Sequence, residues 1–131
     1  MNVWDEIKTR SVDGIDGLVT VVVQDEKTNE VLMLAYANRI ALEKTTETGL
    51  AHYFSTSRKK IWLKGESSGN TQNVSEILID CDMDAVIYRV SQKGGACHKG
   101  YRTCFYRKIQ DGKTVEVEEK LFNPDEIYGK K

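Results

Sequence analysis

The chain has 131 residues, of which 40% are hydrophobic and 30% are charged, and its formal net charge is -1 at pH 7. These values are ordinary for one globular domain that is long enough to bury a core without disulfide bonds or structural metal ions. A net charge near zero gives no reason to expect a nucleic-acid or membrane partner. The first ten residues lack the apolar core of a signal peptide, and no apolar run reaches membrane-spanning length. We therefore expect a single domain, 1–131, in the cytoplasm.

In the first half of the chain, residues 1–16 form a largely polar lead-in. The β-branched run at 18–24 has the length of a strand, and we expect it to be buried on both faces. Turn residues then lead to a return strand at 31–36. A short helix is expected at 39–48, with Asn38 as its N-cap and a glycine directly after its last residue.

The second half of the chain is composed mainly of short strands. A hairpin is expected across Asp111-Gly112, which is a strong turn signal. Residues 118–131 read as a C-terminal tail. The pattern is typical of a β-rich α+β domain with one main helix. The strands expected in this half lie at 51–55, 61–63, 72–79, 86–90, 104–109 and 114–117.

The stretch from Asp80 to Arg107 concentrates side chains that bind cations. It holds all three cysteines, Cys81, Cys97 and Cys104, and His98 follows Cys97 directly. Three thiolates fit an open zinc site with water as the fourth ligand, whereas His98 as a fourth ligand would close the site. Because adjacent residues chelate one metal awkwardly, we expect His98 beside the metal. The alternative is that the cysteines are buried as small hydrophobes.

Three acids alternate with other residues in the same stretch. On an extended strand Asp80, Asp82 and Asp84 would point to one side and Cys81 to the other. Three carboxylates that face together repel one another unless water or a cation separates them. A Mg²⁺ ion that keeps several waters would satisfy them, and it would be separate from the thiolate site. The alternative is a polar strand end that faces water.

A second stretch, 55–73, mixes basic side chains with hydroxyls, glycines and Trp62. Cations, hydroxyls and free backbone N–H groups are what phosphate oxygens need. Alone, such a run is more often a solvated loop, and an isolated tryptophan more often fills the core. A second basic cluster at 99–107 makes a ligand with two phosphates reasonable. The candidate substrate residues are Arg58, Trp62, Lys64, Ser67, Ser68, Asn70, Lys99 and Arg102.

Six segments together resemble the phosphoribosyl-AMP cyclohydrolase family of histidine biosynthesis. They run in order from Gly17 to Arg107, and their combination is highly specific. No room remains before Lys131 for the pyrophosphohydrolase domain that some relatives carry, so we expect the monofunctional form. The segments are GLVTVVVQD (17–25), VLMLAYAN (31–38), TTETGLAHYFSTSR (45–58), IWLKGESSGN (61–70), DCDMD (80–84) and GGACHKGYRTCFYR (94–107).

The resemblance implies a ligand set and an assembly. The cysteines would hold one zinc ion per subunit, and the three aspartates would hold magnesium. It also implies a homodimer with shared active sites, in which Cys81 of one subunit meets Cys97 and Cys104 of the other. The fold it implies is a pseudobarrel of short, mostly antiparallel strands.

The resemblance also implies a reaction on 1-(5-phosphoribosyl)-AMP. Activated water attacks C6 of the adenine ring, as in zinc-dependent nucleobase deaminases. The N1–C6 bond then breaks, so the amine stays in the product as a carboxamide. His98 is the candidate base, while His52 is interpreted as structural or as a substrate contact. Two alternatives remain: a nucleotide deaminase that releases ammonia, and a binding module with structural zinc in which His98 is a ligand.

Overall fold

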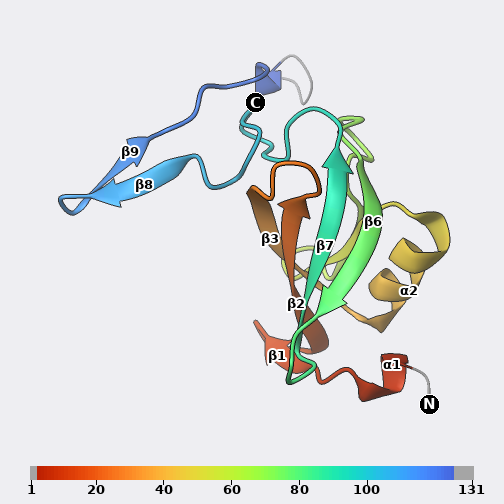
Figure 1. The fold of residues 1–131 in the computed structure, drawn as a ribbon. Coiled ribbons are helices and arrows are strands. Elements are labelled where there is room, and N and C mark those ends of the chain that lie inside the picture. The colour runs from red at the N-terminus through yellow and green to blue at the C-terminus, as the bar shows by residue number, and fades with distance from the viewer. Residues whose placement is uncertain (1–2, 126–131) are drawn as a thin grey trace.

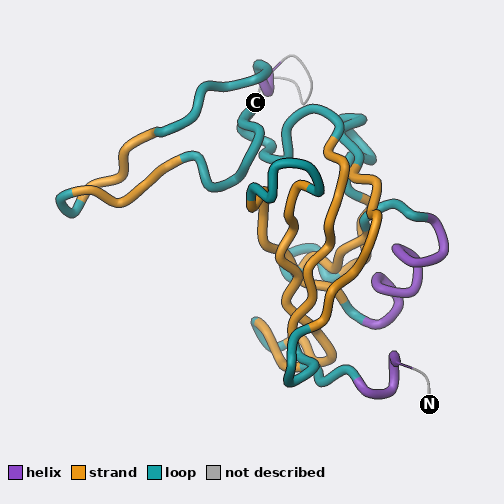
Figure 2. The backbone as a smooth tube through the Cα atoms, viewed as in Figure 1, coloured by secondary structure: helices purple, strands orange, loops and turns teal. Residues whose placement is uncertain are grey.

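The computed structural model describes residues 3–125, so residues 1–2 of the expected lead-in and 126–131 of the expected tail lie outside the described residues (Figure 1). Strands dominate the described part, and the expected β-rich α+β class with one main helix is confirmed (Figure 2). The elements are α1 (Val3–Glu6), β1 (Arg10–Val12), β2 (Ile15–Asp25), β3 (Val31–Ala37), α2 (Arg39–Thr48), β4 (His52–Ser55), β5 (Lys60–Leu63), β6 (Gln72–Ile79), β7 (Ala85–Gln92), β8 (Arg107–Gln110) and β9 (Lys113–Glu116).

One five-stranded sheet organises the molecule. Its strand order is β1-β2-β7-β6, and β3 pairs with β2 as well. The pairing of β2 with β7 is parallel. The other strand pairings are antiparallel, as expected, including the separate hairpins β4–β5 and β8–β9. Within residues 3–125 the sheet stays open and closes into no barrel.

The helix α2 begins and ends where local sequence signals place it. Asn38 is the N-cap, and its side-chain Oδ1 accepts a hydrogen bond from the Ala41 N–H at 2.8 Å. Gly49 follows the last helical residue with φ 75°, a left-handed conformation that a glycine adopts without a steric penalty. Ala41, Leu42 and Thr45 form the buried side of the helix. The predicted helix at 39–48 is therefore confirmed at both ends.

The core lies on one face of the sheet only. Along β2, Val19, Val21 and Val23 are buried and pack in one cluster with Leu42 of α2 and Tyr53 of β4. Val22, which points to the opposite face, remains partly exposed. The expectation that this strand is buried on both faces is therefore wrong for the single chain, because α2 and β4 pack against one face only.

Two further differences concern the ends of the domain. Strand β1 was not expected, although Asp13 and Gly14, both with positive φ, form its turn into β2 and repeat the Asp-Gly signal. The strand expected from 104 begins only at Arg107. Asp111 and Gly112 both have positive φ, which confirms the predicted turn. Hairpin β8–β9 stands away from the body of the molecule (Figure 1).

Within residues 3–125, no helix has the length and apolar character needed to cross a membrane.

Candidate active site

A cleft of about 1130 Å³ lies between the segment that follows β4, the loop that follows β7 and the end of the described chain. Seven of the nine residues predicted for catalysis or substrate contact line it, and Asn70 and Arg102 do not. The seven are Arg58, Trp62, Lys64, Ser67, Ser68, His98 and Lys99. The structure therefore gathers basic side chains, hydroxyls and one imidazole, from segments far apart in sequence, around one space.

Two of the three cysteines lie together beside this cleft. Cys97 is 5% exposed, and its Sγ accepts a hydrogen bond from the Lys99 N–H at 3.4 Å. Burial of the Cys104 thiol, together with the neighbouring Cys97 thiol, raises its pKa to about 12, against the opposing effect of Lys64. Thiols lose their protons when they bind a metal, because thiolates are the ligands. The pair fits two positions of a thiolate site.

Lys64 is a cation that interacts electrostatically with this thiol pair. Its Nζ donates a hydrogen bond to the Ala96 carbonyl, 2.5 Å away and one residue before Cys97. Burial lowers the pKa of Lys64, while the Cys104 and Cys97 thiols raise it. Its Nζ also lies 5.8 Å from the centre of the Trp62 ring. Lys64 therefore faces the thiols and the loop backbone as well as the cleft.

The loop between the two thiols is a tight turn. The Cys97 N–H donates to the Tyr101 carbonyl, and the Gly100 N–H donates to the Cys97 carbonyl, both at 3.1 Å. Gly100 has φ 100°, and a Cβ there would lie 2.3 Å from the Phe122 carbonyl oxygen. Only glycine fits this backbone without strain. The Gly100 turn holds Cys97 close to the backbone that leads to Cys104.

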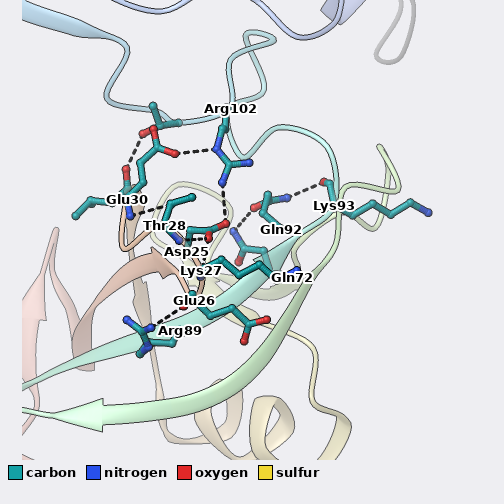
Figure 3. Close-up of polar contacts among 12 residues, drawn as sticks. Asp25, Glu26, Lys27, Thr28, Glu30, Gln72, Arg89, Gln92, Lys93 and Arg102 are labelled. Carbon is teal, nitrogen blue, oxygen red and sulfur yellow. Dashed lines mark hydrogen bonds and ion pairs between the residues drawn. The ribbon is translucent and has the colours of Figure 1, made fainter.

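Arg102 anchors the same loop to the turn between β2 and β3. Its guanidinium donates to Asp25 at 2.7 Å and to Glu30 at 2.8 Å (Figure 3). Hydrogen bonding to Glu30 raises the pKa of Arg102. Burial alone would raise the pKa of Asp25. Hydrogen bonds from the backbone N–H groups of Thr28 and Lys27 and from the Arg102 guanidinium outweigh this effect, so the pKa of Asp25 is lowered. Substrate contact by Arg102 stays a prediction, and the two carboxylates already occupy its guanidinium.

Sequence reasoning missed the aromatic wall of the cleft. The rings of Tyr101 and Tyr106 stack with their centres 3.6 Å apart, and both line the cleft. Arg107 places its charge 5.0 Å from the centre of the Tyr106 ring, and Lys120 places its charge 6.0 Å from the centre of the Tyr101 ring. Two tyrosines that flank Cys104 are visible in the sequence, but their spacing does not indicate that the rings stack.

The three aspartates converge, although not on a strand. Residues 80–84 form the turn between β6 and β7, with φ 66° at Met83, so the expected extended comb is wrong. Oxygen atoms of Asp80, Asp82 and Asp84 nevertheless lie within 4.8 Å of one another. Hydrogen bonds with the Asp84 and Asp80 carboxyl groups raise the pKa of Asp82. Arg10, which was not predicted to take part, pairs with Asp84 at 2.5 Å.

Cys81 lies in this acidic turn and far from the other two cysteines. It precedes β7, whereas Cys97 and Cys104 follow it, and the two ends of β7 are at opposite ends of the sheet (Figure 1). Eight residues of strand span about 25 Å at ~3.3 Å per residue. Zinc binds sulfur at about 2.3 Å, so the three thiols of one chain do not reach a common ion.

The remaining predicted residues lie outside the cleft. The Nδ1 atom of His52 lies 2.8 Å from the Leu50 carbonyl, and its backbone N–H donates to the Thr45 hydroxyl at 2.9 Å. These contacts fit the structural interpretation of His52. The Asn70 side chain packs against Gly94, where a Cβ would lie 2.4 Å from its Oδ1. Among the described residues the buried Asn70 Nδ2 has no hydrogen-bond partner.

A strand-rich α+β domain with an imidazole and several cations in its cleft, and a thiol pair beside it, has side chains suited to a hydrolase that acts on a small phosphorylated molecule. The comparisons with known proteins agree with this class. The model of the family "Phosphoribosyl-AMP cyclohydrolase" matches residues 33–106, inside the stretch that carries the resemblance. Proteins of that name from three organisms are similar to this chain over most of its length.

The protein from Methanococcoides burtonii is 57% identical over 94% of this chain and 98% of its own. The protein from Methanothermobacter thermautotrophicus is 59% identical, over 91% of this chain and 87% of its own. The protein from Methanothrix thermoacetophila is 62% identical, over 85% of this chain and 89% of its own. The chain therefore belongs to the phosphoribosyl-AMP cyclohydrolase family, and it is an enzyme of the hydrolase class.

Proposed function

We propose that the protein hydrolyses the adenine ring of 1-(5-phosphoribosyl)-AMP in histidine biosynthesis. Water adds to C6, the N1–C6 bond breaks, and the exocyclic nitrogen remains in the product as a carboxamide. The observation that carries this proposal is that the matched stretch, 33–106, contains the thiol pair, His98 and most of the basic residues of the cleft. Arg58, Lys64 and Lys99 offer cations for the two phosphate groups.

Within this reaction His98 accepts the proton of the attacking water. It is exposed, lines the cleft and follows directly after a buried thiol. An imidazole changes charge near neutral pH, which suits a group that must take a proton and release it again. The stacked Tyr101 and Tyr106 rings give the same cleft an aromatic side.

The zinc site is proposed to form between two chains, from Cys97 and Cys104 of one and Cys81 of the other. The thiol pair fits two ligand positions, and the position of Cys81 at the far end of β7 supports a third ligand from a second chain. When bound, zinc would lower the pKa of a coordinated water, although three thiolates favour this less than neutral ligands do.

A magnesium ion is proposed for the turn at 80–84. Oxygen atoms of its three carboxylates lie within 4.8 Å of one another, and hard oxygen ligands are what Mg²⁺ prefers. Removing one charge with Asp82→Asn is expected to shift the magnesium dependence of activity to higher concentration while zinc content stays constant. Coincident magnesium titrations of the variant and the wild type would place the ion elsewhere.

Turnover of phosphoribosyl-AMP by the purified protein tests the reaction. The expected product retains all nitrogen atoms, and no ammonia is released. Ammonia at one equivalent per turnover would make the protein a nucleotide deaminase, and absence of turnover with full metal content would favour a structural zinc site. A cytoplasmic location stays a prediction.

Complementation between inactive chains tests the shared site. Cys81→Ala and Cys97→Ala chains are each expected to be inactive, because each homodimer lacks one ligand at both sites. A mixed dimer has one site without both ligands and one intact site. Random mixing should therefore restore up to about a quarter of wild-type activity. No recovery, with subunit exchange confirmed by mass spectrometry, would contradict the shared site.

A further inference from the structure

One loop carries the two serines of the cleft. It runs from residue 65 to residue 70, and we call it the cleft loop. Ser67 and Ser68 within it line the cleft, and Lys64 directly before it does so as well. The cleft loop lies outside every helix and strand of the described chain. The position of its hydroxyl groups therefore depends on how the two ends of the loop are held together.

The two ends of the cleft loop are in close contact. A Cβ on Gly65 would lie 2.6 Å from the Asn70 carbonyl carbon and 2.6 Å from the Thr71 nitrogen. Gly65 also has φ 87°, so a glycine is needed at this position for both reasons. The Gly69 N–H donates to the Gly65 carbonyl at 2.8 Å. The peptide bond between Asn70 and Thr71 thus closes the loop, and we call it the neck.

Gln92, the last residue of β7, holds the neck from the other side. Its Nε2 donates to the carbonyls of Asn70 and Thr71, at 3.2 and 3.4 Å, and to the Lys93 carbonyl at 2.9 Å (Figure 3). Carbonyl oxygens only accept hydrogen bonds, so the NH₂ group of Gln92 must face them. Its Oε1 must then point away from the neck.

Gln72, the first residue of β6, fixes this orientation of Gln92. The two glutamines are partners in the β6–β7 register, and the Nε2 of Gln72 donates to the Oε1 of Gln92 at 2.8 Å (Figure 3). The Oε1 of Gln72 accepts a hydrogen bond from the Tyr53 hydroxyl. All hydrogen bonds of this set therefore run in one direction, from Tyr53 to the neck. We call Tyr53, Gln72 and Gln92 the glutamine network.

The inner part of the glutamine network is fully buried. Tyr53 and Gln72 are both 0% exposed. Burial raises the pKa of Tyr53 well above its usual value, so its hydroxyl stays protonated and remains a donor. A buried amide destabilises a fold unless its polar atoms are hydrogen-bonded, and those of Gln72 are. The Tyr53 ring also lies 5.0 Å from the ring of Trp62, which lines the cleft.

We propose that Gln72 is a positioning residue for the substrate, because through Gln92 it holds the neck and so directs Ser67 and Ser68 toward a phosphate group. This inference rests on the proposed function and adds a residue that does not itself line the cleft. A phosphate group that is distant from C6 is bound alike before and during the reaction. Loss of Gln72 should therefore weaken substrate binding more than it slows the chemical step.

Replacement of Gln72 by leucine tests this role. Gln72→Leu should raise KM for phosphoribosyl-AMP by about tenfold, the effect of one or two lost hydrogen bonds, with kcat and zinc content nearly unchanged. The Gly69 N–H, which reports on closure of the loop, should exchange with solvent about tenfold faster. Steady-state kinetics and amide hydrogen exchange measure the two effects independently.

A double variant tests whether the two glutamines act together. Gln92→Met breaks the same network at a position that is only partly buried, so it also supplies the test if Gln72→Leu does not fold. It should give the same rise in KM and the same faster exchange. Because both residues act through one network, the double variant should raise KM no further than the larger single effect. Effects that multiply would overturn the network.

The matched control is Thr45→Val, which removes a hydroxyl that is also buried and bonded, to the Ala41 carbonyl at 2.9 Å. It should lower stability while KM and the exchange of the Gly69 N–H stay unchanged. An equal rise in KM in this control would mean that any loss of stability weakens binding, and it would overturn the inference. Wild-type KM in Gln72→Leu would overturn it too, even with faster exchange.

Failure of the proposed function gives a different result. Absence of turnover by the wild-type protein would contradict the proposed function, and the role of Gln72 toward the substrate with it. Turnover by the wild type with unchanged kinetics in both glutamine variants would contradict this inference alone.

Discussion

At the scale of single residues, Lys64 shows how the fold changes the role of a charge that the sequence suggests for phosphate. Its Nζ is bonded to the Ala96 carbonyl, and the Cys104 and Cys97 thiols raise its pKa against the effect of burial. A three-thiolate zinc site carries one net negative charge, which a fixed ammonium would offset. Lys64 therefore serves the thiol pair as much as the cleft.

Replacing Lys64 separates these roles. Lys64→Met is expected to weaken zinc binding by about ten- to hundredfold, since outer partners of metal ligands have effects of that size. Lys64→Arg keeps the charge and should lose much less. Competition with a chromophoric chelator measures both affinities, without reference to activity. Wild-type zinc affinity in Lys64→Met, with activity lost, would leave Lys64 as a substrate contact only.

Arg102 provides a second prediction, with a pH dependence. Arg102→Met leaves the buried charge of Asp25 and the partly buried charge of Glu30 without their partner, which should cost about 1–3 kcal/mol at pH 7. The pKa of Asp25 is lowered in the folded protein, so its stabilising contribution is present above the unfolded pKa of ~3.9 and is lost as pH falls through the folded value.

The difference in unfolding free energy between wild type and Arg102→Met should therefore shrink below about pH 4. Urea unfolding at neutral and acidic pH measures it. Arg58→Met is the control, because Arg58 lies in the cleft and its loss should change substrate binding more than stability. An equal loss at both pH values would mean that Arg102 acts through packing rather than through its carboxylate partners.

At the scale of elements, α2 depends on local signals that a mutation can remove one at a time. Asn38→Ala deletes the oxygen that accepts the Ala41 N–H and should cost about 0.5–2 kcal/mol. Asn38→Asp retains an acceptor and should cost much less. Chemical denaturation measures both, and unchanged zinc content would show that the effect is confined to the helix. Equal stability of Asn38→Ala and wild type would mean that the cap does not contribute to the stability of α2.

The same distinction between local and distant causes explains what the sequence could predict. The helix at 39–48 and the Asp111-Gly112 turn follow from residues next to one another, and both are confirmed. The alternating aspartates at 80–84 satisfy the period of a strand and so suggest an extended arrangement, while the positive φ at Met83, which makes the segment a turn, leaves no mark in composition. The pairing of Arg102 with Asp25 joins residues 77 positions apart, and no spacing rule reaches that far.

The candidate site also has features that depend on sequence neighbours and features that depend on the fold. The residue types around Cys97 indicate metal chemistry because thiols, acids and an imidazole are clustered along the chain. Their sequence proximity hides the separation in space, since Cys81 and Cys97 are only one strand apart in sequence but lie at its opposite ends. The Tyr101–Tyr106 stack was missed because ring contacts depend on how the loop folds back.

At the scale of the whole molecule, the proposed shared metal site would make folding, association and zinc binding one equilibrium. A ligand that binds only the folded dimer stabilises it by mass action, and a dimer is stabilised by its own concentration in the same way. The midpoint of thermal unfolding should therefore rise with the total chain concentration, by about 2–4 °C for each tenfold increase.

Zinc should enlarge this stabilisation in wild type and not in Cys81→Ser, whose homodimers have no complete thiolate site. Differential scanning calorimetry over a wide range of chain concentration, with zinc and with a chelator, measures both effects. The chelated wild type should match Cys81→Ser, because neither then holds zinc in a complete thiolate site. A midpoint that is independent of concentration while zinc still raises it would mean that each chain folds and binds its metal alone.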